Sequence, residues 1–173
     1  YEAVHQIQGW DDLRRRLESD RRCYAFFHPA LPEEPLIFVE AALTTSVAGQ
    51  VQPLLDPKSP VADPGDARCA MFYSITNCQA GLRGVSFGNF LIKQVVADLS
   101  NEFPRLRTFS TLSPIPGFRS WLAGQPGMMS SALQSVLPEI QNARDLAPVP
   151  PAVKNEITRL CAWYLLRAKR GQA

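Results

Sequence analysis

The most strongly patterned part of the chain is residues 70–118, AMFYSITNCQAGLRGVSFGNFLIKQVVADLSNEFPRLRTFSTLSPIPGF. An apolar run at Ala70–Ile75 predicts a buried strand, and the spacing of apolar residues over Asn89–Ser100 predicts an amphipathic helix. A second strand is predicted at Thr108–Leu112, and a helical crossover of this length lets it lie parallel to the first. The stretch is therefore a strand, a glycine-containing loop, a helix and a second strand.

The glycine-containing loop leads into the N-terminus of the predicted helix, where unpaired backbone N–H groups and the helix dipole favour an anion such as phosphate. Neither the G-x-G-x-x-G fingerprint nor the G-x-x-x-x-G-K-[ST] loop is present. From these residues two interpretations stay open. The loop binds a phosphate, or its glycines only let the chain turn from strand into helix.

Composition sets limits on the class of protein. The chain has 173 residues, 46% hydrophobic and 20% charged, which is typical of one folded domain with a substantial core. A net charge of +2 gives no argument for nucleic acid or a membrane surface as a partner. No apolar run approaches the roughly 20 residues that span a bilayer. The four cysteines show no CxxC spacing, which predicts reduced thiols and a cytoplasmic protein.

The first half of the chain predicts a helix and an antiparallel pair of strands. Glu2–Gln6 predicts a short first strand, and Asp11–Glu18 predicts a helix. Cys23–His28 and Leu36–Leu43 predict strands that pair antiparallel, because their connection is too short for a parallel crossover. The apolar side of the helix is expected to consist of Trp10, Leu13 and Leu17.

A cluster of basic residues surrounds this predicted helix. Its members are Arg14, Arg15, Arg16, Arg21 and Arg22. Such a run is usually a solvated helix face, and that is the interpretation we prefer. The alternative is that some of these arginines contact a ligand phosphate.

The last third of the chain predicts helices separated by proline and glycine. Residues 122–152 are expected to form a helical connector that contains both residue types, with a short helix just before it at Phe118–Leu122. Residues 153–170 are expected to form an amphipathic helix, in which Tyr164 is a core or groove residue.

The glycine-containing loop is similar to the R/Q-x-x-G-x-G/A loop of the GNAT acetyltransferase fold, which holds the pyrophosphate of coenzyme A. Arg83 matches the first position of that pattern and Gly88 the last, whereas Ser86 stands where the pattern has its middle glycine. The order of elements agrees as well: strand, helix, antiparallel strands, loop, helix, parallel strand.

Four longer segments together resemble the malonyl-CoA decarboxylase family: RRCYAFFH, FYSITNCQAGLRGVSFGNFLIK, FSTLSPIPGFRSWL and LCAWYLLRAKRG. The resemblance implies an α+β fold, with an acetyltransferase-like mixed sheet flanked by helices and truncated before its last strands. Residues 1–173 would be a partial catalytic domain. An N-terminal helical domain that mediates homo-oligomer contacts is expected before Tyr1, and a segment with the catalytic histidine is expected after Ala173.

The same resemblance implies a function. Malonyl-CoA would be decarboxylated to acetyl-CoA and CO₂ through a thioester enolate, which supplies acetyl-CoA and controls malonyl-CoA levels in fatty acid metabolism. Coenzyme A is then part of the substrate, and no metal or other cofactor is expected. Ser113 matches the active-site serine of the family. The coenzyme A-binding loop is expected to consist of Arg83, Gly84, Val85, Ser86, Phe87, Gly88 and Asn89.

Ser113 by itself, before Pro114, is typical of a turn, and only the resemblance makes it a catalytic candidate. No Ser–His pair is visible, so we expect the hydroxyl to orient the substrate rather than attack it. His28 is either a proton donor or a hydrogen-bonded histidine at a strand end, and Cys78 either a reactive thiol or packing. Two other functions stay open: a coenzyme A-dependent acyltransferase of the same fold, and a non-catalytic coenzyme A-binding fragment.

Overall fold

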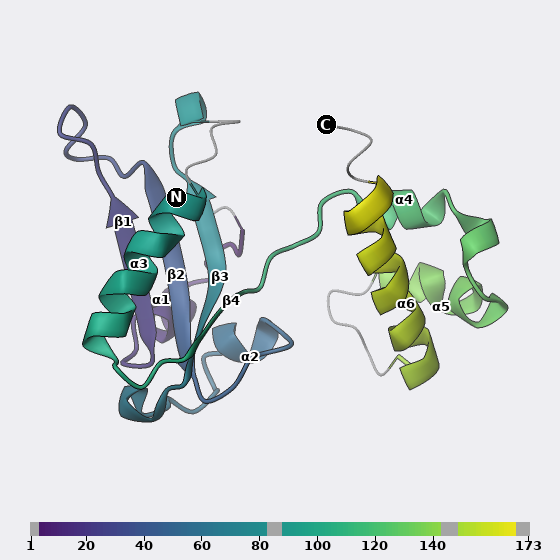
Figure 1. Ribbon diagram of the computed structural model, residues 1–173, viewed down its shortest axis with the longest axis horizontal. Coiled ribbons are helices and arrows are strands. Elements are labelled where there is room, and N and C mark those ends of the chain that lie inside the picture. The colour runs from purple at the N-terminus through teal and green to yellow at the C-terminus, as the bar shows by residue number, and fades with distance from the viewer. Residues whose placement is uncertain (1–3, 83–87, 143–148, 169–173) are drawn as a thin grey trace. The chain divides into compact units, whose positions relative to one another are not determined.

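The computed structural model describes residues 4–82, 88–142 and 149–168 of the chain. The chain divides into two compact units, Tyr1–Ser113 and Pro114–Ala173, each of which has its own apolar core (Figure 1). The first unit contains the sheet, and the second is helical.

Four strands form the sheet of the first unit, in the order β1-β2-β3-β4. They are β1 (Arg21–Phe26), β2 (Ile37–Thr44), β3 (Cys69–Asn77) and β4 (Thr108–Thr111). Strands β1, β2 and β3 pair antiparallel, and β4 pairs parallel to β3. The prediction of two antiparallel strands followed by a parallel pair is therefore confirmed, and so is the mixed α+β class.

Helix α3 (Gly88–Glu102) covers one face of this sheet, as Figure 1 shows. The helix was predicted at Asn89–Ser100 from its apolar spacing, and that prediction is confirmed. Val95 and Leu99 are fully buried against Phe72 and its neighbours on the same face of the strands. Burial of side chains of this size stabilises the fold by about 1.5–3 kcal/mol each, so this contact fixes the helix on the sheet.

The parallel strands β3 and β4 pair over only part of their length. Strand β4 pairs with Cys69–Phe72, and the amide of Leu112 still donates to the carbonyl of Phe72 at 2.8 Å. Strand β3 continues through Tyr73–Asn77, which at about 3.3 Å per residue is roughly 16 Å of further strand. The two strands therefore separate just before Ser113.

The other face of the sheet lies under α1 (Trp10–Arg16) and α2 (Gln52–Leu55). A second apolar cluster on this face contains Ala42, Leu54, Cys69, Met71 and Tyr73. The strand predicted at Glu2–Gln6 is wrong over its described part, Val4–Gln6. The ring of His5 lies 6.5 Å from the ring of Tyr73, so this segment packs on side chains instead of pairing with a strand.

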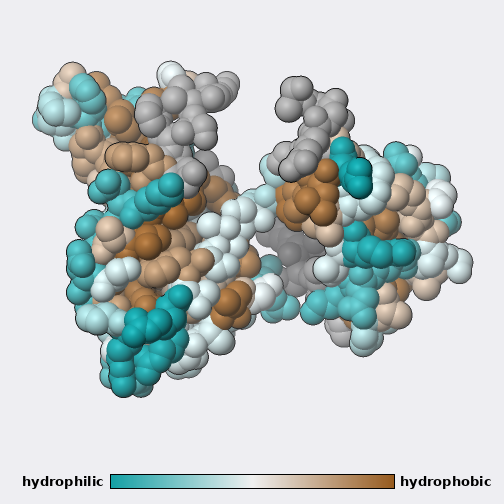
Figure 2. Space-filling model, in the orientation of Figure 1, coloured by the Kyte–Doolittle hydropathy of each residue, from teal (hydrophilic) through white to brown (hydrophobic). Residues whose placement is uncertain are grey.

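The second unit is a group of helices around its own core. It contains α4 (Phe118–Ala123), α5 (Ser131–Asn142), α6 (Pro151–Trp163) and a π-helical turn, η4 (Tyr164–Ala168), that continues α6. Its buried core consists of Leu122, Met129, Leu133, Val153 and Leu160. Apolar atoms are visible at the C-terminal end of α6 (Figure 2), where Trp163, Leu165 and Leu166 are exposed. Tyr164 is buried among these exposed neighbours.

Candidate functional site

Ser113 lies at the end of the first unit, two residues after β4 and just beyond the point where β3 and β4 separate. The residue is exposed, and no hydrogen bond of its hydroxyl is found within the part of the chain that the structure describes. The hydroxyl therefore lies at the surface, beside the point where the pairing of β3 and β4 ends.

The predicted coenzyme A-binding loop, Arg83–Asn89, immediately precedes and enters helix α3 in the sequence. Residues Arg83–Phe87 lie outside the described residues, as do the side chains of Gly88 and Asn89, with which α3 begins. Figure 1 shows α3 beginning at the end of the sheet toward which β3 runs. Because β4 is parallel to β3, it runs toward this end too, so Ser113 and the start of α3 lie in the same direction along the strands.

The prediction that the arginines around α1 form a solvated face is wrong for three of the five. Arg15, Arg16 and Arg21 are only 4%, 1% and 4% exposed, whereas Trp10 and Leu17 are 83% and 65% exposed. Helix α1 therefore turns its charged side inward and part of its apolar side outward. This is the reverse of the orientation that the apolar spacing predicted.

Arg16 is held by two carboxylates on the inner side of the sheet. Its Nε donates to Asp12 at 2.8 Å, and its Nη1 donates to Glu40 of β2 at 3.1 Å. Glu40 is 1% exposed, so the ion pair is fully buried. A charge is tolerated in such a place only when it is paired and hydrogen-bonded.

A second buried group of charges surrounds Asp20. Arg15 donates to both of its carboxylate oxygens, at 2.7 and 3.0 Å, and Arg21 lies 3.0 Å from the same carboxylate. The backbone amide of Ala62 also donates to Asp20. The buried arginines therefore neutralise internal carboxylates, and the alternative that they contact a ligand phosphate finds no support.

Both aspartates keep their charge because of these contacts. Burial raises the pKa of Asp12 and Asp20, but hydrogen bonds and neighbouring positive charges together outweigh it and hold both pKa values below the ordinary 3.8. The opposing donors are Arg16 for the first carboxyl and Arg15 for the second. Because the pKa of each carboxyl is lower in the folded protein than in the unfolded chain, the charged carboxylates stabilise the fold at pH values above the unfolded-chain pKa. This stabilisation is lost as the pH falls through the pKa of the folded protein.

We expect the first unit to unfold in acid for this reason. Between about pH 5 and about pH 2, Asp20→Asn should flatten the dependence of the free energy of unfolding on pH. Asp11→Asn, at an exposed position of the same helix, is the control and should leave the slope unchanged. Urea unfolding at a series of pH values measures the slope. Equal slopes for the two variants would contradict this account.

His28 and Cys78, the two other candidates from the sequence, make local hydrogen bonds to the backbone. His28 is exposed in the β1–β2 connection, where its Nδ1 accepts a hydrogen bond from the amide of Ala30 at 3.1 Å. Cys78 is half-buried, and its thiol donates to the carbonyl of Thr76 at 3.7 Å. All four cysteines are free thiols. None of these contacts points to a role for His28 or Cys78 in catalysis.

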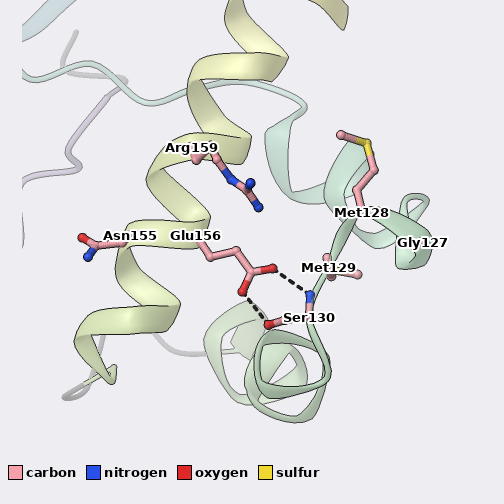
Figure 3. Close-up of a pocket in the computed structure, with 7 residues that line it drawn as sticks. All are labelled: Gly127, Met128, Met129, Ser130, Asn155, Glu156 and Arg159. Carbon is pink, nitrogen blue, oxygen red and sulfur yellow. Dashed lines mark hydrogen bonds between the residues drawn. The ribbon is translucent and has the colours of Figure 1, made fainter.

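A hollow of about 540 Å³ lies in the helical unit, between α6 and the N-terminal end of α5 (Figure 3). The carboxylate of Glu156 accepts hydrogen bonds from the amide of Ser130 at 2.7 Å and from its hydroxyl at 2.5 Å. These hydrogen bonds lower the pKa of Glu156. A helix N-terminus favours an anion, and here the protein supplies its own. The hollow is therefore no candidate for binding a ligand phosphate.

The sheet, its covering helix and its two separating parallel strands define an α+β domain of the acetyltransferase-like type. The family model described as the malonyl-CoA decarboxylase C-terminal domain matches residues 1–173. The chain therefore belongs to this family, as the sequence resemblance implied. No helix among the described residues is long and apolar enough to cross a membrane.

Relatives support the assignment along the whole chain. The chain is 39% identical to mitochondrial malonyl-CoA decarboxylase of Anser anser anser, over 99% of this chain and 40% of that protein, and 38% identical to the Mus musculus protein, over 99% and 41%. The chain thus spans about 40% of the length of these relatives.

Solved structures agree on the fold. The structure of malonyl-CoA decarboxylase from Rhodopseudomonas palustris matches with a TM-score of 0.82 at 46% identity, over 97% of this chain and 43% of that one. The structure from Agrobacterium vitis matches with a TM-score of 0.78 at 45% identity, over 95% and 42%.

Proposed function

We propose that this chain is part of an enzyme that decarboxylates malonyl-CoA to acetyl-CoA and CO₂. The observation that carries the proposal is the separation of β3 and β4 directly before Ser113, in a chain of the malonyl-CoA decarboxylase family. We place the extended pantetheine arm along the part of β3 that β4 leaves unpaired. Its acyl end then lies beside Ser113, and its nucleotide end lies toward the start of α3.

The phosphates of the coenzyme are assigned to the glycine-containing loop, Arg83–Asn89. Support comes from the position of this loop before α3, a helix of 15 residues, because backbone N–H groups at a helix N-terminus bind phosphate. Arg83 adds a positive charge, and Gly88 allows close approach of the backbone.

Decarboxylation of malonyl-CoA needs few functional groups from the protein. Loss of CO₂ from malonyl-CoA leaves a carbanion that is already delocalised into the thioester as an enolate. The site has to hold the carboxylate out of the thioester plane and to donate hydrogen bonds where negative charge develops. An acid must then protonate the carbon. We assign the donor or orienting role to the hydroxyl of Ser113, and we assign the acid to no residue of this chain.

Incubation of the protein of full natural length with malonyl-CoA tests the proposal. Release of CO₂ with formation of acetyl-CoA, in the absence of any acceptor, supports a decarboxylase. A requirement for an amine acceptor would instead support an acyltransferase. Binding of malonyl-CoA without turnover would support a coenzyme A-binding protein, and either of these two results would overturn the proposal.

Removal of metal ions should leave this activity unchanged. The thioester itself stabilises the enolate, so the proposed reaction needs no Lewis acid and no organic electron sink. Dialysis against a chelator followed by an assay of CO₂ release measures the effect. A loss of rate that is restored by a divalent cation would contradict the expected reaction.

The ligands and the assembly of the protein are also part of this proposal, and its location in the cell stays a prediction. We propose malonyl-CoA and acetyl-CoA as the ligands and a homo-oligomer as the assembly, which sedimentation of the full-length protein tests. The relatives from goose and mouse are named as mitochondrial proteins. The cytoplasmic location expected from the sequence stays a prediction, to be tested by cell fractionation.

A further inference from the structure

Leu112, the residue before Ser113, is attached to the sheet in two ways. Its amide donates to the carbonyl of Phe72 at 2.8 Å, which extends the pairing of β3 and β4 one residue beyond the end of β4. Its half-buried side chain packs on the apolar cluster that contains Met71 and Tyr73. The chain is therefore held to the sheet up to the residue that directly precedes Ser113.

The side chains of β4 and of Leu112 alternate between the two faces of the sheet. Phe109 packs on the cluster under α3, which includes Val95 and Leu99. Leu112, three residues later, packs on the cluster of the opposite face, which lies under α1 and α2. Residues an odd number of positions apart lie on opposite faces of a strand, so the extended alternation continues through Leu112.

Ser113 is the next position in this alternation. A residue that precedes a proline is biased to extended conformations, and Pro114 has this effect on Ser113. The alternation then places Ser113 on the face of the sheet that α3 covers. Because α3 begins at this end of the sheet (Figure 1), Ser113 and the start of α3 share a face as well as an end.

A slip of one residue would reverse this arrangement. Side chains alternate with a period of two, so the slip would move Ser113 to the face that lies under α1 and α2. Strand β4 is four residues long, and Phe109 is its only large apolar residue. Leu112 supplies a second apolar contact, on the opposite face. Together the two residues fix the face on which each residue of this segment lies.

We propose that Leu112 is a positioning residue, whose side chain fixes the end of β4 and thereby holds the Ser113 hydroxyl on the face of α3. This inference rests on the proposed function, in which that hydroxyl contacts the malonyl group. Leu112 acts through Ser113 and is assigned no contact with the substrate. All the contacts that carry the inference lie within the first unit, Tyr1–Ser113.

The test is Leu112→Ala in the protein of full natural length, assayed with malonyl-CoA. This change removes the packing of the side chain and keeps the amide that binds Phe72. We expect kcat to fall about tenfold with KM within about twofold, because the lost positioning acts on the reacting group rather than on binding. Leu112→Met nearly keeps the side-chain volume and should retain kcat within about twofold.

Leu55→Ala is the matched control, because Leu55 of α2 is also half-buried and packs on the same apolar cluster. The same side chain is truncated on an element other than the one that carries Ser113. We expect a melting temperature lowered about as much as in Leu112→Ala, with kcat within about twofold of the unmodified protein. Equal losses of kcat in the two variants would overturn the positioning role, since activity would then follow stability alone.

The decisive comparison repeats Leu112→Ala in a Ser113→Ala background. If Leu112 acts through Ser113, its effect on kcat disappears there, because residues that act as one unit are non-additive. An equal loss in both backgrounds, or no loss in either, would overturn the positioning role. Absence of CO₂ release from the unmodified protein would instead overturn the proposed function, so the two failures are distinguishable.

Leu112→Val takes the place of Leu112→Ala should the alanine variant lose its native circular dichroism spectrum. It removes a single carbon from the side chain and suits a strand, since β-branched residues favour extended backbone. We expect a loss of kcat that is smaller than tenfold and that again disappears in the Ser113→Ala background. Unchanged kcat in the folded Leu112→Val variant would contradict the proposed role.

Discussion

Replacing Arg16 by methionine is expected to destabilise the first unit by about 3–5 kcal/mol. The substitution leaves Asp12 and Glu40 buried without their guanidinium, and an uncompensated buried charge costs about this much. Native-state hydrogen exchange of β2 amides measures the effect, because it reports the free energy of opening of the sheet separately from that of the helical unit.

Arg14→Met is the matched control, because it removes the same charge from an exposed position of the same helix. Arg14 lies on the exposed side of α1, and Arg14→Met should change the free energy of opening by no more than about 0.5 kcal/mol. Adding Glu40→Gln to Arg16→Met should recover part of the loss, because it removes one stranded charge. An Arg16 variant as mild as the Arg14 variant would show that the buried ion pairs contribute little.

Local patterns predicted most of the sheet unit. Strands β3 and β4 and helix α3 follow from two short apolar runs and one helical spacing, with bounds within a few residues of those observed. Their parallel pairing follows from the length of the crossover between them. These features depend on neighbours along the chain, and for that reason one sequence was sufficient.

Helix α1 was predicted with the wrong side buried, for a physical reason. Apolar spacing favours Trp10 and Leu17 as the inner residues, because periodicity assumes that charges prefer water. Glu40, on a strand 24 residues after Arg16, reverses that preference by supplying a buried counter-charge. Pairing between such distant residues is invisible to a local pattern. A lone acidic residue inside the apolar run LIFVEAAL was the available signal.

The candidate site divides in the same way. The resemblance assigned Ser113, and the structure adds that β3 and β4 separate beside it. Neither spacing nor resemblance indicated the hydrogen bond that the hydroxyl of Tyr164 donates to the carbonyl of Pro116 in the helical unit. The signal available in the sequence was only the glycine in SPIPGF, since a glycine after two prolines suggests a left-handed turn. Only the folded structure shows that Tyr164 lies beside Gly117.

Ser113→Ala is expected to lower the rate of CO₂ release about 100-fold, the size usual for loss of one hydrogen-bond donor to a developing charge. If the hydroxyl acts mainly in the transition state, kcat and kcat/KM should fall together. Thr111→Val removes another exposed hydroxyl two residues earlier and is the control, with turnover expected to stay within about twofold. Steady-state kinetics with malonyl-CoA measures both variants.

The same serine admits a second mechanism, which mass spectrometry distinguishes. A nucleophilic Ser113 would carry an acyl group during turnover, whereas an orienting hydroxyl forms no covalent bond. No hydrogen bond between the Ser113 hydroxyl and a base is found among the residues that the structure describes, and a serine without such a base is a poor nucleophile. Protein quenched during turnover should therefore have the mass of the unmodified chain. An acyl adduct on Ser113 would refute orientation, and unchanged turnover in a folded Ser113→Ala variant would remove this residue from the mechanism.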